Sequence, residues 1–342
     1  MKKIFTLAAF FGLAYGASSC FEPSIEESVA DGHIHSAARI GDEDDDHKKD
    51  RSCATMEVLA EKLQEDPELA EKLKEIDKHA DKFASKNGRI SAAAAYTGTV
   101  TIPVVINIIY NSAKPQENIS DAQIASQMNV LNADFNATNA DRGQTPSAFA
   151  AAINGSGFDV QFTLSKVVRK ASTKTSWGTR DAMKKSRNGG IEPTDPARNL
   201  NIWVCNIGGG ILGYAQFPGG NLSTDGVVIS PQYFGTTGYV AAPFNKGRTA
   251  THEVGHWLNL RHIWGDGGCG IDDYVSDTPD SDAPNYGCPA FPTVKCGNTL
   301  MTMNYMDYTD DACMYMFTNG QKARSRALFN SGGARSSFVP VQ

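Results

Sequence analysis

Basic residues are not in excess in this 342-residue sequence, since 32 lysines and arginines stand against 38 acidic residues and the formal net charge is -6. With a pI near 5.7, the chain has no broad basic footprint for nucleic acid or anionic lipid, so nucleic acid is not expected as a partner. An apolar share of 41% and a charged share of 20% are ordinary for a globular protein with one large or two smaller domains.

The N-terminus lacks an apolar run long enough to span a bilayer, because the run that follows two lysines ends at Tyr15. Small residues then lead to Cys20, which gives residues 1–20 the layout of an export signal. Small residues directly before a cysteine resemble a bacterial lipobox, although Ala17 replaces the usual leucine. We therefore predict a lipoprotein signal peptide and membrane attachment through lipidated Cys20, with plain secretion as the alternative. In both cases the mature chain is exported, to the cell surface and outer membrane or to the extracellular space.

Cysteine is also sparse, with seven in the chain, but after Cys20 is set aside four of the other six fall within residues 269–313. In an exported protein this crowding predicts two disulfides in that region. Cys205 lies in the apolar run LNIWVCNI and is expected to be a buried free thiol that packs as a small hydrophobe.

A core-forming pattern is missing from residues 21–50, which are polar and acidic and indicate a solvated tether. Residues 54–85 carry leucines and alanines among alternating charges and predict one or two amphipathic helices broken near Pro67. A small-residue linker follows, with an expected proteolytic site after Arg89. We therefore predict that residues 21–89 form a unit of tether and helices apart from the main domain.

Beyond the linker the chain is rich in β-branched residues. Strands are predicted at residues 99–111, 158–168, 200–207 and 225–235, a helix at 119–135 with Ser120 as its N-cap, a glycine turn at 208–210, and an edge strand at 212–218. A second helix carries the histidines described next. The order strand, helix, strands, helix predicts a mixed sheet backed by helices.

Histidine is scarce, with seven in the chain, yet three lie in THEVGHWLNLRH, residues 251–262. On a helix, positions i and i+4 share a face, so His252 and His256 can point their imidazoles at one ion while Glu253 reaches a water beside it. His262 can join them only if the helix ends and the chain turns back. Three neutral imidazoles leave one zinc position open, which is the condition for catalysis, and Glu253 as general base suits peptide hydrolysis.

These residues resemble a known family. The pattern HExxHxxGxxH followed by a methionine turn marks the metzincin zinc metallopeptidases, and HEVGHWLNLRH with NYMDYTDDAC is similar to the pappalysins, including their ulilysin-like bacterial branch. The resemblance covers roughly residues 90–335. It departs at Asn259, where the family has glycine, but asparagine is the next most tolerant residue of the left-handed conformation required there, so His262 is kept as the third ligand.

The resemblance implies an α+β zincin fold, in which a twisted mixed five-stranded sheet is backed by helices and an active-site helix carries the extended zinc motif. It implies an N-terminal catalytic subdomain at residues 90–262. An irregular C-terminal subdomain with the methionine turn and disulfides is implied at residues 263–342. The implied crossed disulfides are Cys269 with Cys296 and Cys288 with Cys313.

Two residues of NYMDY receive roles from the resemblance. Met306 is implied as the hydrophobic base beneath the three imidazoles, and Tyr308 as a phenol near the metal that stabilises the tetrahedral oxyanion. For Met306, an ordinary core methionine is the alternative.

The segment IDDYVSDTPDSDAP, residues 271–284, is dense in carboxylates, and oxygen ligands are what calcium prefers. The resemblance implies a structural calcium ion here, with Asp273, Asp277 and Thr278 as its ligands. The alternative is a solvated acidic loop without a metal.

The stretch RSCAT, residues 51–55, is similar to the R-x-C-G-T sequence of pappalysin pro-segments, with Ala54 in place of the glycine. A thiolate is a better zinc ligand than water, so Cys53 is implied as a latency switch that fills the open position until the pro-segment is removed. Arg51 is expected to pair with a carboxylate and hold the segment in the cleft, in the direction opposite to a substrate. An incidental cysteine is the alternative.

The predicted function is therefore that of an exported zinc endopeptidase, made as a latent zymogen, that hydrolyses extended protein and peptide substrates. A preference for Arg or Lys after the scissile bond is expected if an acidic residue lies at the base of the primed-side pocket. Asp307, Asp310 and Asp311 are near the methionine turn, although Ala312 directly precedes Cys313.

Two other functions compete with this prediction. A thermolysin-like hydrolase would take a glutamate from a downstream helix as its third ligand, but the chain after His262 contains no glutamate at all. A catalytically retired, zinc-binding surface lipoprotein would serve only as a binding module. Glu253 and Tyr308 argue against that function, because zinc binding requires neither.

Overall fold

The computed structural model describes residues 50–84, 96–153, 155 and 157–340. The predicted signal peptide with Cys20, most of the tether, and the linker with Arg89 lie outside the described residues, so these predictions stay predictions. Within the described part of the chain, no helix combines the length and the apolar character needed to cross a membrane.

A five-stranded sheet has the strand order β2-β1-β3-β5-β4. Its strands are β1 (Val100–Asn111), β2 (Val160–Ser172), β3 (Leu200–Val204), β4 (Gly213–Ala215) and β5 (Val227–Ile229). Neighbouring strands are parallel except β4, which lies at one edge and pairs antiparallel with β5. The central strands β1 and β3 are buried almost throughout, which fits the apolar runs seen in the sequence. The predicted mixed sheet and its edge strand are confirmed.

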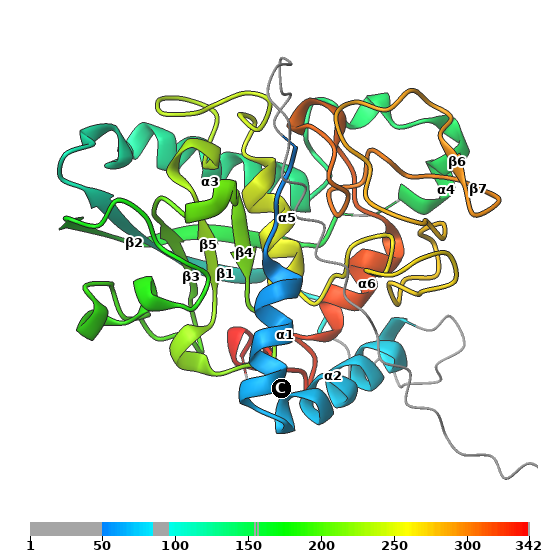
Figure 1. Cartoon of the computed structure of the whole chain (residues 1–342). Coiled ribbons are helices and arrows are strands. Elements are labelled where there is room, and N and C mark those ends of the chain that lie inside the picture. The colour runs from blue at the N-terminus through cyan, green and yellow to red at the C-terminus, as the bar shows by residue number, and fades with distance from the viewer. Residues whose placement is uncertain (1–49, 85–95, 154, 156, 341–342) are drawn as a thin grey trace, which may run out of the picture. The chain divides into compact units, whose positions relative to one another are not determined.

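Two helices, α3 (Asp121–Phe135) and α5 (Arg248–Trp257), contact each other and pack on the sheet. The Ser120 hydroxyl accepts a 3.1 Å hydrogen bond from the Gln123 backbone N–H, which is the predicted N-cap. Apolar side chains of both helices and of β1, among them Leu131, Val254 and Ile106, share one buried cluster. The helix α5, which carries the histidines, therefore rests on the main core beside β4 (Figure 1).

The N-terminal helices are α1 (Thr55–Glu65) and α2 (Glu68–Ala84), and the predicted break near Pro67 is confirmed. Figure 1 shows them side by side with the rest of the structure: α1 contacts β4, and α2 contacts α6 (Asn319–Ala327). Leu59, Leu69 and Leu73 bury their apolar faces against Phe217, just beyond β4. Thus α1 covers the edge strand, and α2 packs beside it at Phe217.

After α5 the chain has little regular structure apart from α6 and a short hairpin, β6 (Val294–Lys295) with β7 (Asn298–Thr299). Earlier in the chain, α4 (Ala150–Ile153) forms a single turn, and a 3-10 turn over the glycines at 208–210 leads into β4 as expected. The structure contains the disulfides Cys269–Cys296 and Cys288–Cys313, the same pairs that the resemblance implies. Cys205 is a buried free cysteine.

Candidate metal centre

The three histidines of the motif converge because α5 ends where it does. His252 and His256 lie one turn apart on α5, which ends at Trp257. Asn259 then adopts the left-handed conformation, with φ of 70°, and turns the chain back so that His262 faces the other two. All three imidazoles are buried.

The outer nitrogen of each ring is held by a neighbouring oxygen. His252 Nδ1 lies 2.7 Å from the Tyr305 carbonyl, and His256 Nδ1 lies 2.8 Å from the Leu260 carbonyl. His262 Nδ1 pairs with the Asp266 carboxylate. A proton on each Nδ1 satisfies these contacts and leaves the Nε2 lone pairs facing one another.

The spacing of the inner atoms fits a tetrahedral zinc ion. His256 Nε2 lies 3.2 Å from His252 Nε2, 3.1 Å from His262 Nε2 and 3.7 Å from Cys53 Sγ. Bonds of about 2.0 Å to nitrogen and 2.3 Å to sulfur put tetrahedral ligand atoms roughly 3.3 Å apart for two nitrogens and roughly 3.5 Å apart for nitrogen and sulfur, close to these distances. Burial lowers the pKa values of His252 and His256 well below the ordinary value, which keeps both rings neutral, as a metal requires. Within the described part of the chain, these four residues are the one group of histidines, cysteines and carboxylates with this spacing.

The Glu253 carboxylate lies beside this centre and is occupied by the N-terminal segment. Its Oε2 accepts a 2.8 Å hydrogen bond from the Thr55 hydroxyl and lies 3.4 Å from Cys53 Sγ. The Thr55 hydroxyl in turn accepts from the Ala215 backbone N–H of β4 at 2.8 Å. Burial raises the pKa of Glu253 to about 7, against the opposing effect of the Thr55 hydrogen bond. A carboxylate in this position can hold a proton as well as accept one.

Met306 packs against α5 at Gly255, and Tyr308 lies beside the imidazoles of His252 and His262. A Cβ atom on Gly255, between the two helical histidines, would come within 2.5 Å of Met306 Sδ, so this close approach requires glycine. The Tyr308 ring lies 4.9 Å from the His262 ring, and its hydroxyl donates to the Cys53 carbonyl at 3.4 Å. The phenol thus already points at a peptide carbonyl next to the metal centre.

Arg51 enters a closed pocket next to the metal centre. Its Nη2 lies 2.6 Å from Asp311 Oδ1, and both side chains are buried, with exposed fractions of 1% and 0%. Its Nε donates to the Thr309 carbonyl at 3.2 Å, and Nη1 lies 3.3 Å from the Thr249 hydroxyl. The guanidinium carbon lies 4.8 Å from the centre of the Phe244 ring, which forms one wall. The pocket is therefore built for a cationic side chain.

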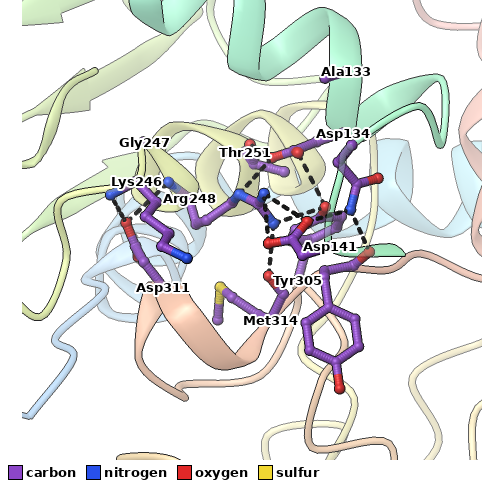
Figure 2. Close-up of polar contacts among 12 residues, drawn as sticks. Ala133, Asp134, Asp141, Lys246, Gly247, Arg248, Thr251, Tyr305, Asp311 and Met314 are labelled. Carbon is purple, nitrogen blue, oxygen red and sulfur yellow. Dashed lines mark hydrogen bonds and ion pairs between the residues drawn. The ribbon is translucent and has the colours of Figure 1, made fainter. Parts of the chain in front are cut away.

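The second oxygen of Asp311 is fixed by the backbone. Figure 2 shows the Asp311 carboxylate next to the start of α5, where Oδ2 accepts from the N–H groups of Lys246 at 2.8 Å and Arg248 at 3.2 Å. These contacts hold the carboxylate in one orientation, with Oδ1 left to meet a cation.

Arg248 joins the start of α5 to the methionine turn through the buried network of Figure 2. Its Nη1 donates to the Tyr305 hydroxyl at 2.9 Å and to the Met314 carbonyl at 2.6 Å, while its Nε lies 3.2 Å from the Asp134 carboxylate. Asp134 also accepts from the Thr251 hydroxyl at 2.7 Å, and burial raises its pKa to about 7. Since the Tyr305 carbonyl receives His252 Nδ1, the network fixes the backbone that orients this histidine.

The three predicted calcium ligands belong to two different hydrogen-bonded groups in the structure. Thr278 donates its hydroxyl to Asp273 at 2.8 and 2.9 Å, whereas the Asp277 carboxylate accepts from the Thr318 hydroxyl and from the Gly320 N–H at the start of α6. The calcium ion stays a prediction.

The role of Thr55 was not predicted from the sequence, and the sequence left the choice among Asp307, Asp310 and Asp311 open. Asp307 accepts from Asn285 and the Tyr308 N–H, Asp310 lies beside the Cys288 sulfur, and Asp311 forms the ion pair with Arg51. The sequence signal for Thr55 was its place two residues after the cysteine in RSCAT, where α1 begins.

Three comparisons identify relatives of this chain. A family model, peptidase M43, described as pregnancy-associated plasma protein-A, matches residues 192–330. An extracellular metalloprotease 1 from Coccidioides posadasii is 33% identical over 251 residues, which span 70% of this chain and 80% of the relative. Among solved structures, a promirolysin mutant from Tannerella forsythia is 40% identical, with a TM-score of 0.75, covering 84% of this chain and 97% of its own.

The mature form of the same relative was solved with a cleaved peptide. Mature Tannerella forsythia mirolysin in that complex is 46% identical to this chain, with a TM-score of 0.68, over 71% of this chain and 96% of its own. The fold prediction is confirmed by these matches together with the five-stranded sheet and the buried histidine cluster. This chain therefore belongs to the peptidase M43, or pappalysin, family and is a zinc metalloprotease.

Proposed function

We propose that the protein is an exported zinc endopeptidase, held latent by residues 21–89, that cuts proteins and peptides before arginine or lysine. The main support for this proposal is the burial of the Arg51 guanidinium against Asp311. Arg51 is separated by a single residue from Cys53 at the metal centre. Export is supported by the leader and by curated relatives that are named extracellular metalloproteases. Cleavage after Arg89 would separate the latent segment from catalytic subdomains at residues 90–262 and 263–342.

His252, His256 and His262 would hold the zinc ion, which when bound supplies Lewis acidity to the scissile carbonyl and lowers the pKa of water to about 7. Glu253 is the group placed to take a proton from the attacking water and return it to the leaving amine. Tyr308 donates a hydrogen bond from its phenolic hydroxyl to the scissile carbonyl oxygen as negative charge develops on that oxygen. The backbone of Gly213 and Ala215 offers an edge to which an extended substrate can add as a further strand.

Latency follows from the contacts of the N-terminal segment. Cys53 takes the position that water needs, Thr55 holds both Glu253 and the Ala215 N–H, and Arg51 fills the pocket of Asp311. The segment pairs with β4 at Gly213 in parallel direction. A substrate lying in the opposite direction would meet the same groups, so the segment excludes it from every one of them.

A peptide library cut by the mature enzyme tests the proposed specificity. We expect Arg and Lys to be enriched at least tenfold directly after the scissile bond, because a cation there reaches Asp311 Oδ1 in a buried pocket. Cleavage sites are read by mass spectrometry. Cleavage of the library without enrichment of either residue would contradict the proposal. If neutral residues are the most enriched directly after the scissile bond, the contacts of Arg51 do not indicate the substrate preference.

Cys53→Ala in the full-length precursor tests the latency switch. We expect this precursor to process itself about ten times faster than the wild type, because the open metal position is no longer filled by sulfur. The appearance of the shortened chain is followed by gel electrophoresis. Cys205→Ala, which removes the other buried free thiol, serves as the matched control. Equal processing rates of the wild type and the Cys53 variant would remove Cys53 from the mechanism.

A further inference from the structure

A second cationic site lies under the N-terminal helices, at a distance from the pocket of Asp311. Asp77 of α2 pairs with Arg324 of α6, whose side chain is 1% exposed against 18% for the carboxylate. Ile76, next to Asp77, packs closely on Gly219: a Cβ atom on Gly219 would lie 2.8 Å from Ile76 Cδ1. The helix α2 therefore acts as the outer cover of Arg324.

Arg261 lies beside Arg324, and the two guanidinium groups share the Tyr274 ring. The guanidinium carbon of Arg324 lies 5.0 Å from the centre of that ring and that of Arg261 lies 6.0 Å away. Two arginines held this close favour a carboxylate between them.

Both arginines keep hydrogen-bonding capacity that the described part of the chain does not use. Arg324 Nη1 and Arg261 Nε are buried and have no hydrogen-bond partner there. Arg324 Nε donates a hydrogen bond to the Asn259 carbonyl, and Nη2 donates to the Asp77 carboxylate. When α2 leaves, Arg324 loses its carboxylate partner and has donors for another one.

This arginine pair is close to the metal centre. The Phe217 ring lies between the two sites, with its centre 4.5 Å from the guanidinium carbon of Arg261 and 5.4 Å from the ring centre of His256. The pair is reached from Cys53 by following the N-terminal segment away from Arg51, through α1 to α2 (Figure 1). If the pocket of Asp311 receives the residue after the scissile bond, the arginine pair faces residues before it.

We propose that removal of the N-terminal segment uncovers a subsite, made by Arg261, Arg324 and Tyr274, that binds an acidic side chain on the non-primed side of the substrate. This inference rests on the proposed function and extends it: preferred substrates carry a carboxylate before the scissile bond as well as a cation after it. Asp77 fills the subsite in the precursor as Arg51 fills the pocket of Asp311.

Paired fluorogenic peptides test the subsite with the mature enzyme. Each pair has arginine after the scissile bond and differs only in glutamate against glutamine at the second, third or fourth residue before it. We expect kcat/KM to be about tenfold higher for glutamate at one of these positions at low salt, and this ratio to shrink as salt screens the charges. In Arg261→Gln and Arg324→Gln the ratio should fall to about one.

Arg326→Gln, on the same helix but bonded to Tyr96 and Gly98, is the matched control and should keep the wild-type ratio. Arg324 supports the turn at Asn259, so if its variant does not fold, Arg261→Gln alone decides. A ratio of one at all three positions in the wild type, or a ratio that survives both substitutions, overturns the subsite while cleavage before arginine stands. If the wild type cuts none of the peptides, the proposed function fails, and the subsite fails with it.

Discussion

Glu253→Gln in the mature enzyme is expected to lower kcat/KM for casein or a peptide by about three to four orders of magnitude, with zinc content unchanged. The amide cannot take the proton of the attacking water, and general base catalysis of this kind contributes up to about 10⁴-fold. Glu253 bonds Thr55 and contacts Cys53, whereas the metal group is made of Cys53 and the three histidines, so its loss leaves the metal ligands in place.

Activity and zinc are measured on the same samples. Glu192→Gln, which changes a carboxylate bonded to Ser186 away from the cleft, is the matched control and should behave as the wild type. Equal activity of the Glu253 variant and the wild type would refute the mechanism. Loss of zinc together with activity would instead show that Glu253 holds the metal site together.

Asp311→Asn should produce the second largest effect, a drop of about 100-fold in kcat/KM for peptides with arginine after the scissile bond. A charge-assisted contact in a buried pocket loses roughly 2 to 3 kcal/mol when one charge is removed, which corresponds to this factor. The asparagine keeps one oxygen for the backbone N–H groups of Lys246 and Arg248, so the start of α5 retains an acceptor.

The measurement compares arginine peptides with otherwise identical peptides that carry leucine at that position. Selectivity should fall in Asp311→Asn and stay at the wild-type level in Asp310→Asn, the neighbouring aspartate, whose carboxylate lies beside the Cys288 sulfur. Unchanged selectivity in the Asp311 variant would show that the cation is recognised elsewhere. A drop of equal size for both peptides would mean that the substitution damages the site as a whole.

Local sequence patterns were sufficient for the five-stranded sheet, for the helices α1, α2, α3 and α5 and for the histidine cluster, whereas α6 and the short hairpin were not predicted. His252 and His256 are fixed by the helical period, and the positive φ of Asn259 fits the tolerance that made it an acceptable replacement for glycine. The break at Pro67 and the cap at Ser120 follow from the chemistry of single residues. In each case the signal and its structural effect lie within one turn of chain.

Contacts between distant segments could not be predicted in this way. Arg51 and Asp311 lie 260 residues apart, and the choice of Asp311 over its neighbours depends on backbone N–H groups that only the folded start of α5 presents. The pairing of Asp77 with Arg324 likewise depends on how α2 lies on α6, and charges alternate along α2 without marking this one. Sequence spacing carries no information about such encounters.

The many separate contacts of the N-terminal helices affect how the protein would switch on. While the linker is intact, these helices meet the cleft at a high effective concentration, and strand pairing, sulfur and two ion pairs all act together. Severing the linker breaks none of these contacts. After the cut, the N-terminal fragment can dissociate and rebind, and it competes with the substrate for the cleft. Full proteolytic activity should therefore depend on dilution or on further degradation of the freed fragment.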